Sequence, residues 1–159
     1  MVDTTAPSDF PVEKINAAHR QALMIVGAIA GTLPMYAIVV EVLRHSQPAP
    51  VASAGLNMIR ITIFVLAGII IFTTTVIKGI MLRSTPASGE ARLARLRASS
   101  VMTAALAEAP AVLGLVLFMM NRQRADFYLL LVVAAYMLAR HFPQRDRWET
   151  YVRRGGDAR

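Results

Sequence analysis

Cysteine is absent from this sequence, and charged residues are scarce. None of the 159 residues is a cysteine, which excludes disulfides, thiolate metal sites and cysteine nucleophiles. Only 17% of the residues are charged, whereas soluble domains carry about 25%. The first 20 residues mix acidic and basic side chains, so no cleavable signal peptide is predicted. Hydrophobic residues make up 55% of the chain and gather in long runs, which predicts a membrane protein.

Four apolar stretches are long enough to be considered as membrane spans, since a bilayer core needs about 20 helical residues. They cover residues 22–43, 58–82, 99–120 and 126–142. Only a few residues separate the last two stretches, which requires a tight antiparallel connection. The predicted fold is therefore an all-α, four-helix transmembrane bundle built from two antiparallel hairpins, with residues 21–142 as one domain.

The distribution of basic residues predicts an orientation. With four spans, the two termini and the loop between spans two and three lie on the same side of the membrane. That side holds thirteen of the lysines and arginines, and the other side holds Arg44, Arg60, Arg122 and Arg124. Because basic residues gather on the cytoplasmic side, both termini are predicted to be cytoplasmic.

Both ends of the chain have the composition of membrane-surface segments. Residues 1–20 form a predicted N-terminal tail in which Phe10–Arg20 is a candidate amphipathic interfacial helix. Residues 143–159 mix Trp148 and Tyr151 with charged side chains, which favours either a segment at the headgroup level or a solvated cytoplasmic tail.

Glu108 is an acidic residue near the middle of the third predicted span. It follows Ser99 by nine residues, which places it about 13 Å into a hydrocarbon core about 30 Å thick. A charged carboxylate at that depth costs several kcal/mol when it faces lipid. We therefore expect Glu108 to face the helix bundle, to be protonated or to have a polar partner. The small residues beside it permit close helix packing.

Counting the same depth along the other spans predicts polar partners for this acid. The second span brings a run of three threonines to the level of Glu108, and the first span brings Thr32. Threonine hydroxyls can donate to a carboxylate or accept from a carboxylic acid. The sequence thus predicts a candidate ion, proton or helix-packing site that consists of Glu108, Thr32, Thr73, Thr74 and Thr75.

A weak internal repeat aligns Pro34 with Pro110. The segment GAIAGTLP then lies over TAALAEAP, and Thr32 lies opposite Glu108. Two similar hairpins would form a parallel repeat, an arrangement known in membrane proteins. Each proline also removes a backbone hydrogen bond, so both positions are predicted helix kinks.

The stretch RSTPASGEARLARLRASSVMTAALAEAPAVLGLVLFMM, residues 83–120, resembles the loop and second helix of subunit c, the proteolipid of rotary ATP synthases. Arg83 and Pro86 match the loop, and Glu108 and Gly114 match the helix. The resemblance implies that Glu108 is a carboxyl group that carries H⁺ or Na⁺. The second span departs from the family pattern, because bulky residues 69–72 stand where the family's first helix has closely spaced glycines.

Other polar residues indicate structural roles. Glu41 and Arg60 are predicted to lie at the headgroup level, as a candidate ion pair. The three histidines lie far apart, so no metal site is predicted. No phosphate-binding loop, nucleophile motif or paired-carboxylate motif is present, so no catalytic site, no cofactor and no enzyme activity are predicted. The basic segments beside the spans favour anionic lipid headgroups, and not nucleic acid, as their partner.

Three functions remain open for a multi-pass protein of the cytoplasmic (inner) membrane. The first is a non-catalytic subunit or assembly partner of a larger membrane complex, or a homo-oligomer. The second is a proteolipid-like protein that handles protons or cations through Glu108. The third is a small oligomeric transporter.

Overall fold

The chain folds into four α-helices in a computed structural model that describes residues 12–46, 54–83 and 89–143. The helices are α1 (Val12–Ser46), α2 (Ala54–Arg83), α3 (Gly89–Asn121) and α4 (Arg124–Arg140). No strand occurs within these three ranges. The all-α, four-helix bundle predicted from the sequence is confirmed.

Three of the helices are long and apolar enough to cross a membrane, namely α1, α2 and α3. The fourth, α4, has 17 residues and is about 25 Å long. By contrast, α1 has 35 residues and a length of about 52 Å, well beyond a hydrocarbon core of about 30 Å. The predicted fourth span thus corresponds to a helix shorter than the other three.

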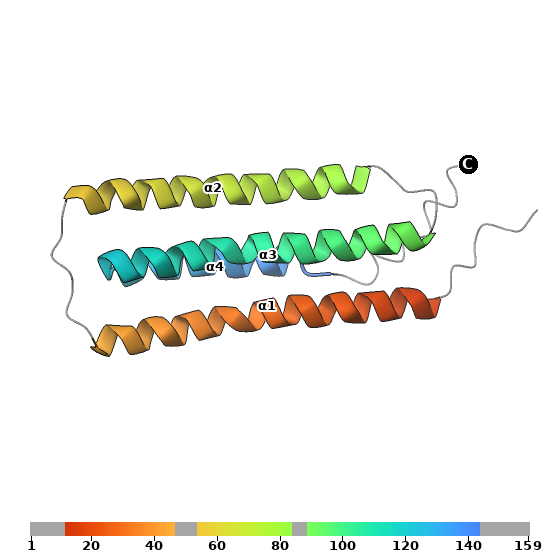
Figure 1. Cartoon of the computed structure of the whole chain (residues 1–159), viewed down its shortest axis with the longest axis horizontal. Coiled ribbons are helices and arrows are strands. Elements are labelled where there is room, and N and C mark those ends of the chain that lie inside the picture. Colours follow the sequence, from red (N-terminus) through yellow and green to blue (C-terminus); the bar gives the residue numbers. More distant parts are fainter. Residues whose placement is uncertain (1–11, 47–53, 84–88, 144–159) are drawn as a thin grey trace, which may run out of the picture.

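The central helix of the bundle is α3, which packs against each of the other three helices. Figure 1 shows α3 between α1 and α2, with α4 behind it. Burial agrees with this central position of α3. In its most apolar stretch 44% of the residues are buried, against 17% in the corresponding stretches of α1 and of α2. The sequence predicted two packed hairpins, but α1 packs chiefly against α3 and not against α2.

The helices α1 and α3 run parallel and stay in one register. Near their N-termini, Lys14 Nζ lies 2.8 Å from Glu90 Oε1, and farther along Thr32 Oγ1 lies 2.6 Å from Glu108 Oε1. Both pairs are separated by 76 positions in the sequence. The same offset aligned the two prolines in the sequence, and each helix continues past its proline.

The N-terminal turns of α1 and α3 extend the bundle beyond the predicted spans. A small apolar cluster of Ile15, Ala22, Leu93 and Leu96 holds these turns together. His19 Nε2 lies 3.1 Å from the backbone oxygen of Pro143, which brings the end of α4 to the same place. Residues 12–20, predicted as part of a candidate interfacial helix, are the first turns of the continuous helix α1. The predicted interfacial or tail segment at 144–159 lies outside the described residues.

Helix α3 packs closely against α4 at Gly114. A Cβ atom at this position would lie 3.0 Å from Leu130 Cβ and 3.3 Å from the backbone oxygen of Phe127. A tight connection forces this packing, because α3 ends at Asn121 and α4 begins at Arg124. Arg122 turns the chain with a positive φ of 57°, and its backbone NH donates to the Phe118 oxygen at 2.8 Å.

Candidate functional site

Glu108 lies on the half-buried side of α3 that faces α1. The buried residues beside it on α3 include alanines at 104, 107 and 111, which leave room for the neighbouring helices. From Glu108 to the end of α3 at Asn121 is a rise of about 20 Å, so the carboxyl lies far from that end of the bundle. The structure therefore places this acid inside the helix packing, as the cost of exposing a carboxylate to lipid requires.

Two hydroxyl groups of α1 contact the same carboxyl oxygen. Tyr36 Oη and Thr32 Oγ1 each lie 2.6 Å from Glu108 Oε1. Residues four apart share one face of a helix, so α1 presents both hydroxyls to α3 together. Within the described part of the chain, no hydrogen bond reaches the second oxygen, Oε2. Glu108 is thus a polar link between two parallel helices.

The Thr32 hydroxyl has two acceptors within reach and one proton to give. Its Oγ1 lies 2.7 Å from the backbone oxygen of Ile29 and 2.6 Å from Glu108 Oε1. When the proton points to Ile29, the short contact with Glu108 requires that the carboxyl group be the donor. The geometry therefore accommodates a neutral carboxylic acid as well as a carboxylate, through rotation of one hydroxyl.

The predicted threonine layer is only partly brought together. Thr32, which the depth count placed level with the acid, contacts Glu108. On α2, Thr74 is buried and Thr75 is exposed, and each donates to the backbone oxygen four residues earlier, at 2.7 Å and 3.1 Å. Thr73 is half-buried. The structure gives no hydrogen bond from these three hydroxyls to Glu108 among the residues that it describes.

Tyr36 is the partner of Glu108 that sequence reasoning missed. Depth counting selected residues whose Cα atoms lie level with the acid, but a tyrosine reaches along the helix axis to its hydroxyl. A signal was present, because Tyr36 follows Thr32 by four residues and so shares its face of α1. Aromatic residues with a hydroxyl usually find a hydrogen-bond partner when they are buried, and Glu108 is the acid within reach.

A second acid, Asp126, joins α2 to the α3–α4 hairpin. Its side chain is only 3% exposed, and Arg60 Nη2 of α2 lies 2.7 Å from its Oδ1. Asn121 Nδ2 donates to the other carboxyl oxygen at 3.3 Å. The predicted ion pair between Glu41 and Arg60 is therefore wrong: Arg60 reaches Asp126 instead, since α2 packs on α3 and away from α1.

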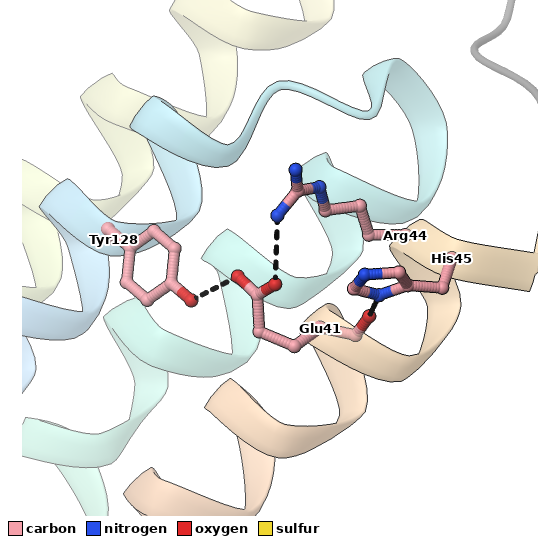
Figure 2. A network of polar contacts seen from close by, with 4 residues as sticks. All are labelled: Glu41, Arg44, His45 and Tyr128. Atoms are coloured by element: carbon pink, nitrogen blue, oxygen red, sulfur yellow. Dashed lines mark hydrogen bonds and ion pairs between the residues drawn. The ribbon is translucent and has the colours of Figure 1, made fainter.

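Glu41 is the centre of a third polar network, at the same end of the bundle. Figure 2 shows its carboxylate between Tyr128 of α4 and Arg44 of α1. Tyr128 Oη donates to Oε1 at 2.7 Å, and Arg44 Nη1 donates to Oε2 at 3.2 Å. His45 Nδ1 lies 2.7 Å from the backbone oxygen of Glu41. Each of the three acids thus contacts a side chain from a neighbouring helix.

Helix length and hydropathy define the class: the chain is a multi-pass membrane protein with a four-helix bundle. Within the described residues, no three His, Asp or Glu side chains gather where they could hold a metal ion. Comparison with protein families, with curated proteins and with solved structures finds no match. The resemblance of residues 83–120 to subunit c therefore stays a prediction.

Proposed function

We propose that this protein is a non-catalytic subunit or assembly partner of a larger membrane complex. The observation that carries the proposal is the pair of contacts made by Glu108, which lies farther from the helix ends than the other described acids. Its Oε1 lies within hydrogen-bond distance of two hydroxyl groups of α1, so the acid joins α1 to α3 and fixes their register. Acids that join helices are expected in a packing protein, because an unpartnered carboxylate in the bilayer is costly.

The outer surfaces of α1 and α2 fit a protein that packs against others within the bilayer. Both helices bury little of their apolar length in this chain, and large apolar side chains such as Met35, Ile69 and Phe72 are more than half exposed. Lipid and a partner helix are equally apolar, so association relies on packing at such faces. This exposed apolar area is available to lipid, to a membrane partner or to a second copy of the chain.

We further propose four spans with both termini in the cytoplasm. Two observations support this topology. The connection between α3 and α4 is only two residues long, and the end of α4 returns to the start of α1 through the contact between His19 and Pro143. The excess of lysine and arginine at the termini and the central loop then favours the cytoplasmic side, in the inner membrane.

A second candidate function is proton or cation handling by Glu108. The geometry of Thr32 favours it, because one hydroxyl rotation serves both the neutral and the charged carboxyl. Oε2 also remains open to a further ligand. In this reading the Tyr36 and Thr32 hydroxyls would hold Oε1 while a proton or a cation such as Na⁺ exchanges at Oε2.

Reaction of Glu108 with dicyclohexylcarbodiimide separates the two functions. For the packing function, we expect no labelling of Glu108, together with migration on native gels as part of a larger membrane complex. Glu108→Gln is the matched control for labelling at this carboxyl. Labelling that Na⁺ or raised pH abolishes, from a chain that migrates alone, would establish ion handling and refute the packing function.

A further inference from the structure

The side of α3 that faces away from α4 is covered by none of the described helices. Figure 1 shows α1 and α2 on either side of α3, with α4 behind it. Exposed residues recur every three to seven positions along this open face, at Ala98, Ala105, Val112 and Val116. Glu108 borders the open face, because it follows Ala105 by three residues and precedes Val112 by four. This half-buried acid therefore lies at the edge of the contact between α1 and α3.

The carboxyl group of Glu108 has one oxygen left for a partner outside the chain. Its Oε1 lies 2.6 Å from the hydroxyls of Thr32 and Tyr36, and no hydrogen bond reaches Oε2 in the described part of the chain. A polar atom without a hydrogen-bond partner is unfavourable in hydrocarbon, where no water replaces the missing donor. A neighbouring protein that brings a donor to this depth would therefore bind favourably.

A donor of this kind lies on the exposed surface of α4. Tyr136 is 60% exposed, and its Oη accepts a hydrogen bond from Arg140 Nη1 at 3.2 Å. The proton of the hydroxyl is thus still available, and no acceptor for it lies among the described residues. Arg140 forms no ion pair with an acid of the described chain. Tyr136 and Arg140 together present a donor and a positive charge that lack an acid.

The donor and the acid lie at the same depth in the bundle. Helices α3 and α4 run antiparallel, and Gly114 of α3 meets Leu130 of α4. Glu108 precedes Gly114 by six residues and Tyr136 follows Leu130 by six, so each lies about 9 Å along its helix from that contact. Copies of a membrane protein share one orientation across the bilayer. Tyr136 of one copy therefore reaches the level of Glu108 in another copy.

We propose that copies of this chain assemble head to tail, with α4 of one copy on the open face of α3 in the next. Tyr136 and Arg140 then meet Glu108 of the neighbouring copy, and a charge-assisted hydrogen bond to Oε2 completes the carboxyl. This inference rests on the packing function proposed for Glu108, and it makes a second copy of the chain the partner.

Head-to-tail contact suits this surface better than a two-fold symmetric dimer. In a symmetric dimer the open faces of two α3 helices would meet, and the exposed residues along this face carry no donor for Oε2. The two acids would instead approach each other. A head-to-tail contact uses two different faces of each copy, so every copy can bind two neighbours.

Cysteine cross-linking in the membrane tests the contact, since the chain has no cysteine of its own. The same register places Ala105 level with Ala139, and both are exposed. On oxidation, the double variant Ala105→Cys with Ala139→Cys should form a ladder of dimers, trimers and larger species, whereas each single variant should stay monomeric. The control pair is Val76→Cys with Ala139→Cys. Val76 is 41% exposed on α2, outside the proposed contact, so this pair should form no ladder.

Three results of this experiment would overturn the proposal. Dimers from either single variant would show that like faces meet, and equal ladders from the test and control pairs would show random collision. Monomers alone, from a chain that migrates on native gels within a larger complex, would refute head-to-tail assembly and leave the packing function of Glu108 standing. Labelling of Glu108 tests that packing function separately.

The variant Tyr136→Phe tests the hydrogen bond and keeps the aromatic ring. Association of the copies, measured by energy transfer between labelled chains in lipid vesicles, should weaken about threefold, as for an average hydrogen bond between membrane helices. Tyr128→Phe is the matched control, because the Tyr128 hydroxyl donates to Glu41 of its own chain at 2.7 Å. The control should leave association unchanged, and equal weakening by the two variants would overturn the proposal.

Discussion

Replacing Arg60 by leucine is expected to lower the free energy of unfolding by about 3 kcal/mol, the lower end of the range for breaking a buried ion pair. The reason lies in its partner, because Asp126 is 3% exposed and would lose the guanidinium that lies 2.7 Å away. Because Arg60 itself is 43% exposed, we expect a loss of stability at the lower end of that range. Titration from mild detergent into dodecyl sulfate measures the change.

Two further variants separate the ion pair from the packing around it. Arg60→Leu combined with Asp126→Leu removes both charges and should recover most of the lost stability, since no charge is then left buried. Arg44→Leu breaks the exposed pair with Glu41 and should cost less than about 1 kcal/mol. If Arg60→Leu cost no more than Arg44→Leu, the pair with Asp126 would not attach α2 to the bundle.

Substituting Gly114 by valine is expected to destabilise the bundle by about 2 kcal/mol, within the range for overpacking a well-packed core. A Cβ atom at this position meets Leu130 Cβ at 3.0 Å and the Phe127 backbone oxygen at 3.3 Å. The backbone oxygen cannot rotate away, so α4 must move as a whole. The same unfolding titration measures this effect, and Gly114→Ala should give a smaller loss.

Gly68 on α2 is the matched control for this substitution. It lies within a membrane-spanning helix as Gly114 does, but a Cβ atom there meets nothing within 4 Å. Gly68→Val should therefore change the free energy of unfolding by less than about 0.5 kcal/mol, as for most surface substitutions. Equal effects at the two glycines would mean that the loss at Gly114 reflects helix propensity and not the contact between α3 and α4.

The helices of this protein were predictable because long apolar stretches can be recognised directly in the sequence. Hydropathy alone located three spans and the shorter α4, and spacing predicted that only a few residues connect α3 to α4. The pairing of Thr32 with Glu108 was also accessible, because counting equal depth along the first and third spans placed Thr32 level with the acid.

The packing partners of the helices were not predictable in the same way. Apolar residues cover α2 on several faces, so hydropathy does not reveal that only Ile63, Ala67 and Thr74 become buried among its described side chains. The pair of Arg60 with Asp126 depends on that choice of face. Tyr36 was missed for a different reason, since the reach of its side chain along the helix is not part of a depth count.

The central claim is that Glu108 joins α1 to α3 through Tyr36 and Thr32, and a double-mutant cycle between Tyr36→Phe and Glu108→Met tests it most directly. The cycle measures whether the two losses in unfolding free energy are additive. We predict a coupling of about 1 kcal/mol, as found for hydrogen bonds between membrane helices. The control cycle pairs Thr75→Val with Glu108→Met and should show no coupling. Additive losses for Tyr36 and Glu108, no different from those of the control, would contradict the account.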